Sequence, residues 1–136
     1  MFGTNDPQND SKYYWTNHVK DKMRYYRISE SLVKRVVRFP KRIEVGVAPG
    51  TIAVMQSRES MSRAGGKTKK KTEEIWIMYQ EVGRSDNKIS KIEKYLSIQK
   101  KRIITAWRYP GVSPIREQIP IPDDILAKLD NLDEID

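Results

Sequence analysis

The segment Glu74–Val82 constrains the fold of this chain more than any other, because it is apolar on both faces of a strand. The five consecutive residues Ile75–Tyr79 read Ile-Trp-Ile-Met-Tyr, so that neither set of alternate positions is polar. A strand with two apolar faces lies in the interior of a sheet, with neighbouring strands on both sides. The sequence therefore predicts a sheet with Glu74–Val82 as its central strand.

Further strands are predicted before and after this segment. Short runs of apolar residues, bounded by turn or loop residues, indicate each of them. They are residues 42–47 and 51–57, joined by the turn Ala48-Pro49-Gly50, and residues 95–98 and 102–109, which form a hairpin or one continued strand. The short aromatic segment Tyr13–Trp15 is predicted either as a first strand or as an anchor.

Two amphipathic helices are predicted ahead of the strands. Asn17–Tyr26 follows Thr16, whose hydroxyl can cap a helix, and Glu30–Arg38 follows Ser29, a second capping residue. Pro40 ends the second helix, since the residue before a proline avoids helical geometry. The fold class expected is α+β: two N-terminal helices packed on one face of an antiparallel sheet of about four strands, with a short C-terminal helix.

Charge divides the chain into segments of opposite sign. The net charge is +8, yet residues 117–136 contain seven acidic residues and one lysine, a charge of −6, so residues 1–116 carry +14. We expect a flexible tail at residues 1–12, a single domain at 13–116 with a mobile basic loop at 58–72, and an acidic tail with a short helix at 117–136. A basic body of this charge favours an anionic partner, of which nucleic acid is the commonest.

The composition excludes several kinds of site. The chain has no cysteine and one histidine, which rules out thiol chemistry and zinc sites built from cysteine or several histidines. Gly66-Lys67-Thr68 resembles the end of a phosphate-binding loop, but Met61 stands where its first glycine is required. Asp123-Asp124 suits a helix N-terminus better than a metal site. We expect no metal and no cofactor. No apolar run reaches the roughly 20 residues of a membrane span, so a cytoplasmic protein is expected and no membrane partner.

His18 is the natural candidate for acid–base chemistry, because histidine ordinarily titrates near neutral pH. Metal-free cleavage of RNA needs a base, cations that stabilise the phosphate, and an acid for the leaving oxygen. Lys22 lies one helical turn after His18, while Arg24 and Arg108 could contact phosphate. The alternative is that His18 only caps or packs at the edge of its helix.

Basic and aromatic residues outside this set are candidates for nucleic-acid binding. The run from Lys67 to Lys71 could contact phosphates or could be a solvated loop tip. Aromatic side chains on strands could stack on bases or belong to the core. The predicted nucleic-acid-binding residues are Arg27, Lys69, Lys70, Lys71, Tyr79 and Tyr109.

The segments His18–Ser29 and Leu32–Pro40 resemble a bacterial and phage family, the "domain of unknown function 4258". That family opens with a histidine, continues with a helix carrying a methionine and arginines, and reaches a second helix that ends near a proline. Here His18, Met23, Ile28, Ser29 and Pro40 match, whereas lysine replaces arginine at position 22. The family is similar in plan to ribonuclease toxins of the RelE and BrnT type. The resemblance implies an RNA-directed role.

The sequence thus predicts a small, basic, RNA-directed protein. One form of this activity is metal-independent, toxin-like cleavage of RNA. The alternatives are a non-catalytic nucleic-acid-binding module and a protein-interaction module. In the last case the acidic tail would contact a protein partner through Ile125, Leu126 and Leu129.

Overall fold

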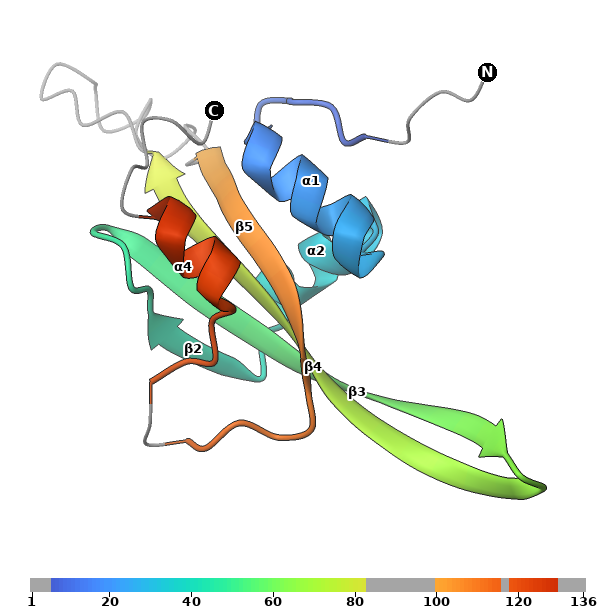
Figure 1. The fold of residues 1–136 in the computed structure, drawn as a ribbon. Coiled ribbons are helices and arrows are strands. Elements are labelled where there is room, and N and C mark those ends of the chain that lie inside the picture. Colours follow the sequence, from blue (N-terminus) through green and yellow to red (C-terminus); the bar gives the residue numbers. More distant parts are fainter. Residues whose placement is uncertain (1–5, 83–99, 116–117, 130–136) are drawn as a thin grey trace, which may run out of the picture.

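The computed structural model describes residues 6–82, 100–115 and 118–129, which form an α+β fold around one five-stranded sheet (Figure 1). The elements are β1 (Tyr13–Trp15), α1 (Asn17–Tyr26), α2 (Glu30–Arg38), β2 (Arg42–Val45), β3 (Thr51–Ala64), β4 (Lys67–Val82), β5 (Lys100–Pro110) and α4 (Asp123–Leu129). The fold class and the bounds of the first two helices agree with the sequence-based prediction. The strand predicted at residues 95–98 lies outside the described residues.

The sheet is mixed, which corrects the antiparallel sheet of about four strands that the sequence predicted. Its order is β1-β5-β4-β3-β2, and β1 runs parallel to β5 with Trp15 opposite Ile103. The remaining neighbours pair antiparallel. A three-residue strand has no measurable periodicity, and its partner lies almost ninety positions along the chain. No local turn could therefore indicate its direction.

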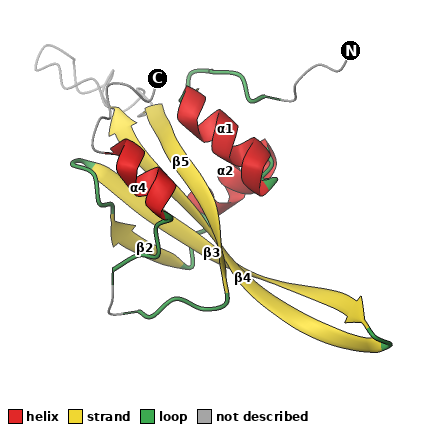
Figure 2. Cartoon of the chain, in the orientation of Figure 1, coloured by secondary structure: helices red, strands yellow, loops and turns green. Residues whose placement is uncertain are grey.

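Helices cover both faces of the sheet (Figure 2). Helices α1 and α2 pack on one face, where Ile75 and Ile77 of β4 are fully buried, as the sequence predicted. Helix α4 packs on the opposite face against Trp76 and Met78. We call these the α1/α2 face and the α4 face. The two apolar sides of β4 thus each meet a separate core, and β4 is the central strand.

Short polar contacts fix where the first two helices begin and end. The Thr16 hydroxyl accepts the Val19 N–H, and the Ser29 hydroxyl accepts the Leu32 N–H, so both predicted caps are present. At the end of α1, Arg27 adopts a left-handed conformation with φ of 56°. This conformation redirects the chain and lets Ile28 donate its N–H to Met23, after which α2 begins two residues later.

Residues 58–73 form a two-stranded arm rather than the mobile loop predicted for residues 58–72. Strands β3 and β4 pair continuously from Thr51 opposite Gln80 to Ala64 opposite Lys67. Pairing with β2 stops at Met55 and pairing with β5 stops at Glu73, so the outer part of the ribbon extends alone (Figure 1). Gly65 and Gly66, both at positive φ, make its turn. Because both faces of the arm meet solvent, no apolar alternation marks it as a strand.

The segments at the two ends of the chain are also part of the domain where they are described. Pro7 is buried, and the Asn9 Oδ1 atom accepts the Trp15 N–H at 2.7 Å. Residues 6–12 of the predicted flexible tail are therefore bonded to the body, and residues 1–5 lie outside the described residues. In the predicted acidic tail, Ile125 and Leu129 are buried in the core of the α4 face. Two of the three side chains assigned to a protein partner thus pack inside the chain itself.

Glu74 anchors the segment that leads from β5 to α4. Its side chain is almost fully buried and accepts the indole N–H of Trp76 at 3.0 Å and the backbone N–H of Ser113 at 3.1 Å. Arg42 lies over the Trp76 ring and donates to the Ser113 hydroxyl. These bonds hold the chain on the α4 face, so that α4 can reach the sheet.

Candidate nucleic-acid interface

The pairing of the arm places three lysines on one of its faces. Side chains alternate between the two faces of a strand, so Lys67, Lys69 and Lys71 point the same way. Ser60 lies opposite Lys71 in the pairing, and all three lysines are exposed. We call them the lysine row. Successive members are about 7 Å apart along the strand, from a rise of about 3.4 Å per residue.

The opposite face of the arm has a different electrostatic character. Lys70 lies there, opposite Met61, and its ammonium forms an ion pair with Glu59 at 3.1 Å. Arg63 is on the same face. Among the described residues, no acidic side chain forms an ion pair with the lysine row. The predicted trio Lys69, Lys70 and Lys71 is therefore split between two faces.

His18 lies in the first turn of α1, where its ring reaches β5. The Nε2 atom is 2.9 Å from the Oγ1 atom of buried Thr105. Partial burial lowers the pKa of His18 below its ordinary value of 6.5, and the positive charge of Lys22 lowers it further. The imidazole is thus favoured in its neutral form. This is the form that a base requires, although one ring nitrogen already has a partner.

The other predicted catalytic residues do not gather around His18. Lys22 forms an ion pair with Asp124 and so joins α1 to α4. Arg24 is bonded to Asp6 at 3.0 Å and to Asp21 at 2.7 Å. Of the three predicted catalytic cations, Lys22 alone lies close enough to His18 to affect its pKa.

Arg108 has a structural role at the end of α1. Its guanidinium donates to the carbonyl oxygens of Tyr26 at 2.6 Å and Arg27 at 2.9 Å, and it forms an ion pair with Glu73. A cation that binds the last carbonyls of a helix satisfies groups that the helix itself leaves unpaired. The set of four catalytic residues predicted from sequence spacing is therefore not assembled as one site. Spacing along a helix could not show which partners would engage each cation.

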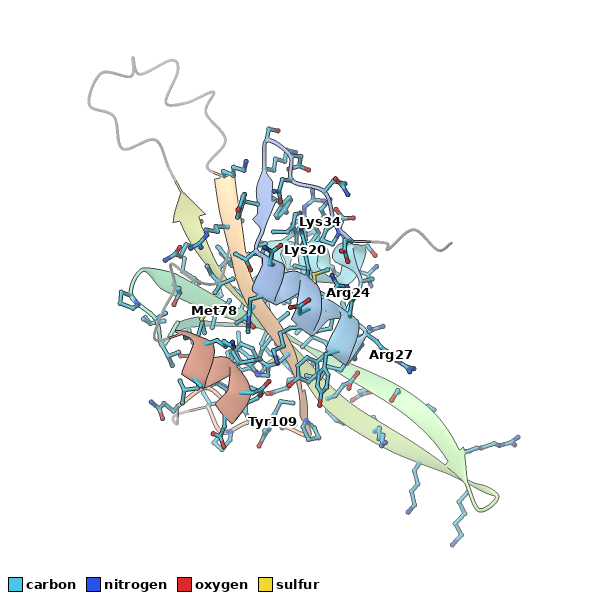
Figure 3. The ribbon with its side chains drawn as sticks, turned by 45° about the horizontal axis from the view of Figure 1, so that its top comes forward. Lys20, Arg24, Arg27, Lys34, Met78 and Tyr109 are labelled. Carbon is cyan, nitrogen blue, oxygen red and sulfur yellow. The ribbon has the colours of Figure 1, made fainter. Side chains whose placement is uncertain are left out.

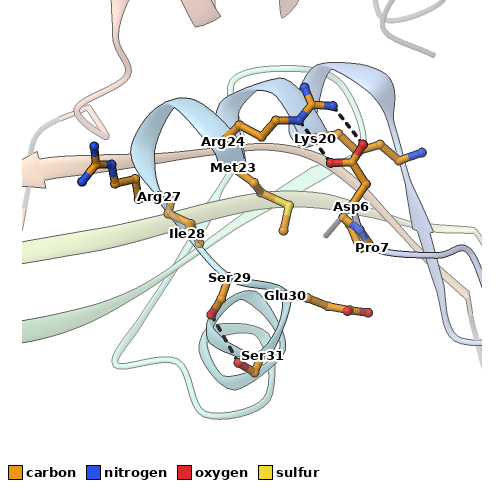
Figure 4. A pocket seen from close by; sticks show the side chains of 10 residues that line it. All are labelled: Asp6, Pro7, Lys20, Met23, Arg24, Arg27, Ile28, Ser29, Glu30 and Ser31. Carbon is orange, nitrogen blue, oxygen red and sulfur yellow. Dashed lines mark hydrogen bonds and ion pairs between the residues drawn. The ribbon is translucent and has the colours of Figure 1, made fainter. Parts of the chain in front are cut away.

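Arg24 and Arg27 line a pocket of about 780 Å³ between α1, the start of α2 and the Asp6-Pro7 segment (Figure 4). Asp6 engages the Arg24 guanidinium through both carboxylate oxygens, at 3.1 and 3.0 Å. Glu30 adds a second acid to the lining. Glu30 is itself paired with Lys34, and Lys20 adds a third cation to the lining. Asp6 therefore compensates the charge of Arg24, while Arg27 is a further exposed cation of the pocket.

Within the described residues, the aromatic side chains of the central strands are largely buried and give bases no open surface on which to stack. Tyr79, predicted to bind nucleic acid, is only 7% exposed in the core of the α1/α2 face. Tyr109 is half-buried against the core of the α4 face. Trp76 and Trp107 are fully buried, with their rings stacked at 5.9 Å. Figure 3 shows Arg27 near the base of the arm, whose side chains extend into solvent. The basic arm therefore replaces the aromatic residues as the principal candidate interface.

Comparison of the chain with protein-family models, with curated proteins and with solved structures finds no match. The resemblance described above remains a prediction from its residues. In the described part of the chain, no helix is long and apolar enough to cross a membrane.

Proposed function

We propose that this protein binds nucleic acid, with RNA the expected class, and that the lysine row of the arm makes the central contact. The observation that carries this proposal is the strand pairing that aligns Lys67, Lys69 and Lys71 on one exposed face. Lysines without acidic partners bind phosphates and release the counterions that surround them. The +14 charge of residues 1–116 supports the same partner, because it attracts a polyanion from a distance.

The shape of the arm favours a folded or duplex nucleic acid over an unpaired strand. A two-stranded ribbon has the width that a major groove of B-form DNA admits, and lysines contact backbone phosphates without reading bases. The major groove of an RNA duplex is too narrow for this fit, so an RNA duplex would be bound across its minor groove, through shape and backbone contacts. Binding of single strands by stacking would need several exposed aromatic rings close together. The rings of the sheet are largely buried, whereas Tyr25 of α1 is 74% exposed.

The test compares two double variants that lose the same charge from the same arm. Lys69→Gln with Lys71→Gln removes two members of the lysine row, whereas Arg63→Gln with Lys70→Gln removes two cations from the opposite face. Affinity is measured by fluorescence anisotropy on an RNA duplex, a DNA duplex and a single-stranded RNA, at several salt concentrations. We expect the first variant to bind its ligand about tenfold more weakly at 0.1 M salt. The slope of log affinity against log salt concentration should also fall, by the amount expected for roughly two fewer released counterions.

The control variant should bind within about threefold of the native protein, because Arg63 and Lys70 lie on the face opposite the lysine row and Lys70 is also paired with Glu59. Equal losses in both variants would contradict the assignment of the lysine row. The absence of salt-dependent binding to all three ligands would contradict the proposed function. The ligand that is bound most tightly, among the RNA duplex, the DNA duplex and the single-stranded RNA, distinguishes RNA from DNA as the partner.

Metal-independent cleavage of RNA is the second candidate, and the neutral form of His18 beside Lys22 favours it. The test incubates the protein with the same RNAs in the presence of EDTA. Cleavage by the native protein and not by His18→Ala would support a catalytic role for His18. Intact RNA in both reactions would leave binding as the activity. Arg24→Gln should be neutral, because Arg24 is bonded to Asp6 and Asp21.

A further inference from the structure

Within the part of the chain that the structure describes, strand β2 leaves backbone hydrogen-bonding groups unpaired at the edge of the sheet. It is the last strand in the order and pairs only with β3. The Gly46 N–H donates to the Thr51 carbonyl oxygen at 2.9 Å, which fixes position 46 as one that bonds inward. Bonded and unbonded pairs alternate along an antiparallel ladder. Ile43 and Val45 therefore direct their N–H and C=O groups outward, and no described residue forms a backbone hydrogen bond with them.

The side chains of the same two residues form an uncovered apolar surface. Ile43 is 64% exposed and Val45 is 87% exposed. They lie on the α1/α2 face, since Val54, opposite Ile43, belongs to its core. Phe39, which ends α2 just before this strand, is 70% exposed. Phe39, Ile43 and Val45 define what we call the β2 edge patch.

Native sheets usually protect an edge with charged side chains, prolines or bulges. Strand β2 has two charged residues, but both lie on the opposite face of the strand from Ile43 and Val45. Arg42 and Glu44 are bonded to each other at 2.8 Å, and Arg42 also donates to Ser113. Neither charge covers the β2 edge patch, so the strand keeps both the unpaired backbone and the apolar side chains that a further strand would need.

The surroundings of the patch are basic, which identifies the chemistry of its partner. Arg35, Arg38 and Lys41 are exposed where the chain enters β2, and none of them forms an ion pair with a described residue, although the Lys41 ammonium donates to the Ser57 hydroxyl at 3.3 Å. A second copy of this chain would offer them no acid from its own β2, because Glu44 is already bonded to Arg42. Two copies would also each bring a net charge of +8. An acidic partner satisfies the cations and reduces this repulsion.

We propose that the β2 edge binds an extended acidic peptide segment, which adds to the sheet as a sixth strand. Its backbone pairs with the outward groups of Ile43 and Val45. Its alternate apolar side chains pack on the β2 edge patch, and its carboxylates lie near Arg35, Arg38 and Lys41. Backbone pairing of this kind provides affinity, while the alternate side chains provide selectivity. The site is separate from the arm, so it does not depend on nucleic-acid binding.

The test uses a fluorescein-labelled heptapeptide, Glu-Val-Glu-Ile-Glu-Val-Glu, and a scrambled peptide of the same composition without alternation. Binding is followed by fluorescence anisotropy, and the site by amide hydrogen exchange measured with NMR. We expect saturable binding of the alternating peptide at micromolar concentrations, at least tenfold tighter than that of the scrambled peptide. Exchange should slow at the amides of Ile43 and Val45, which are otherwise open to solvent.

Val45→Pro removes one outward N–H without removing a bond to β3, and should weaken peptide binding at least tenfold. Val45→Thr keeps the N–H and should weaken binding by less than about threefold. Thermal unfolding of each variant verifies that β2 remains folded, and Ile43→Thr with Phe39→Ser provides a second test that leaves the backbone unchanged. Undiminished binding by Val45→Pro, absent binding at millimolar peptide, or a dimer that Val45→Pro dissociates would each overturn the proposal.

Discussion

At the scale of single residues, His18 makes the stability of the fold depend on pH. Burial and the charge of Lys22 lower the pKa of His18 in the folded protein below its ordinary value of 6.5, while Asp21 and Asp124 oppose the shift. The unfolded chain therefore takes up a proton at a higher pH than the folded one. The stability that the neutral imidazole provides is complete above pH 6.5 and is lost as the pH falls from 6.5 through the folded pKa.

His18→Gln keeps a polar group near Thr105 but removes the titrating imidazole, so it is compared with the native protein. Urea unfolding at pH 7.5 and pH 5.0 should show a larger loss of stability for the native protein than for the variant. The pKa values of Asp10 and Asp124 are lowered from 3.8, so these two groups change stability only below the range from pH 5.0 to pH 7.5 that the unfolding experiment compares. An identical loss in the two proteins would show that His18 is not the group responsible.

At the scale of elements, Thr16 joins α1 to the sheet. Its hydroxyl accepts the Val19 N–H at 3.1 Å and lies 2.9 Å from the Ile104 carbonyl oxygen, to which it donates. Thr16→Val keeps the volume but removes both bonds at a fully buried position. We expect a loss of about 1–3 kcal/mol in the free energy of unfolding, measured by urea denaturation. Thr16→Ser retains the hydroxyl and should lose clearly less stability than Thr16→Val. Equal losses in the two variants would mean that packing of the Thr16 methyl group, rather than capping, stabilises this position.

Elements with local signals could be predicted, and those set by distant contacts could not. Helices α1 and α2 were predicted with their bounds, because caps and apolar stripes lie within a few residues of each other. Strand β4 was recognised from its double apolar face, although its outer half was taken for loop. The pairing of β1 with β5, the dispersed cations of the predicted catalytic set and the two faces of the arm all depend on tertiary structure. The lysine row could have been found from the i, i+2 spacing of Lys67, Lys69 and Lys71, had the arm been read as strand.

At the scale of the whole molecule, the distribution of charge affects binding beyond any single contact. Residues 130–136 contribute four acids and no base, so a chain that ends at Leu129 has a net charge of +12 instead of +8. Such a chain keeps α4, whose Ile125 and Leu129 complete the core of the α4 face. Removing all of residues 117–136 would instead uncover that core. The shorter truncation thus isolates the electrostatic effect from the structural one.

We expect the chain truncated after Leu129 to bind its nucleic-acid ligand about threefold more tightly than the full chain at 0.05 M salt. The acids repel phosphate across the solvent, and their removal raises the attractive field of the body. At 0.3 M salt the Debye length falls to roughly 6 Å, and the two chains should bind equally. Thermal unfolding serves as the control for an intact fold. Equal affinities at 0.05 M salt would show that residues 130–136 do not oppose binding, whereas a gain that persists at high salt would indicate direct occlusion of the interface rather than long-range repulsion.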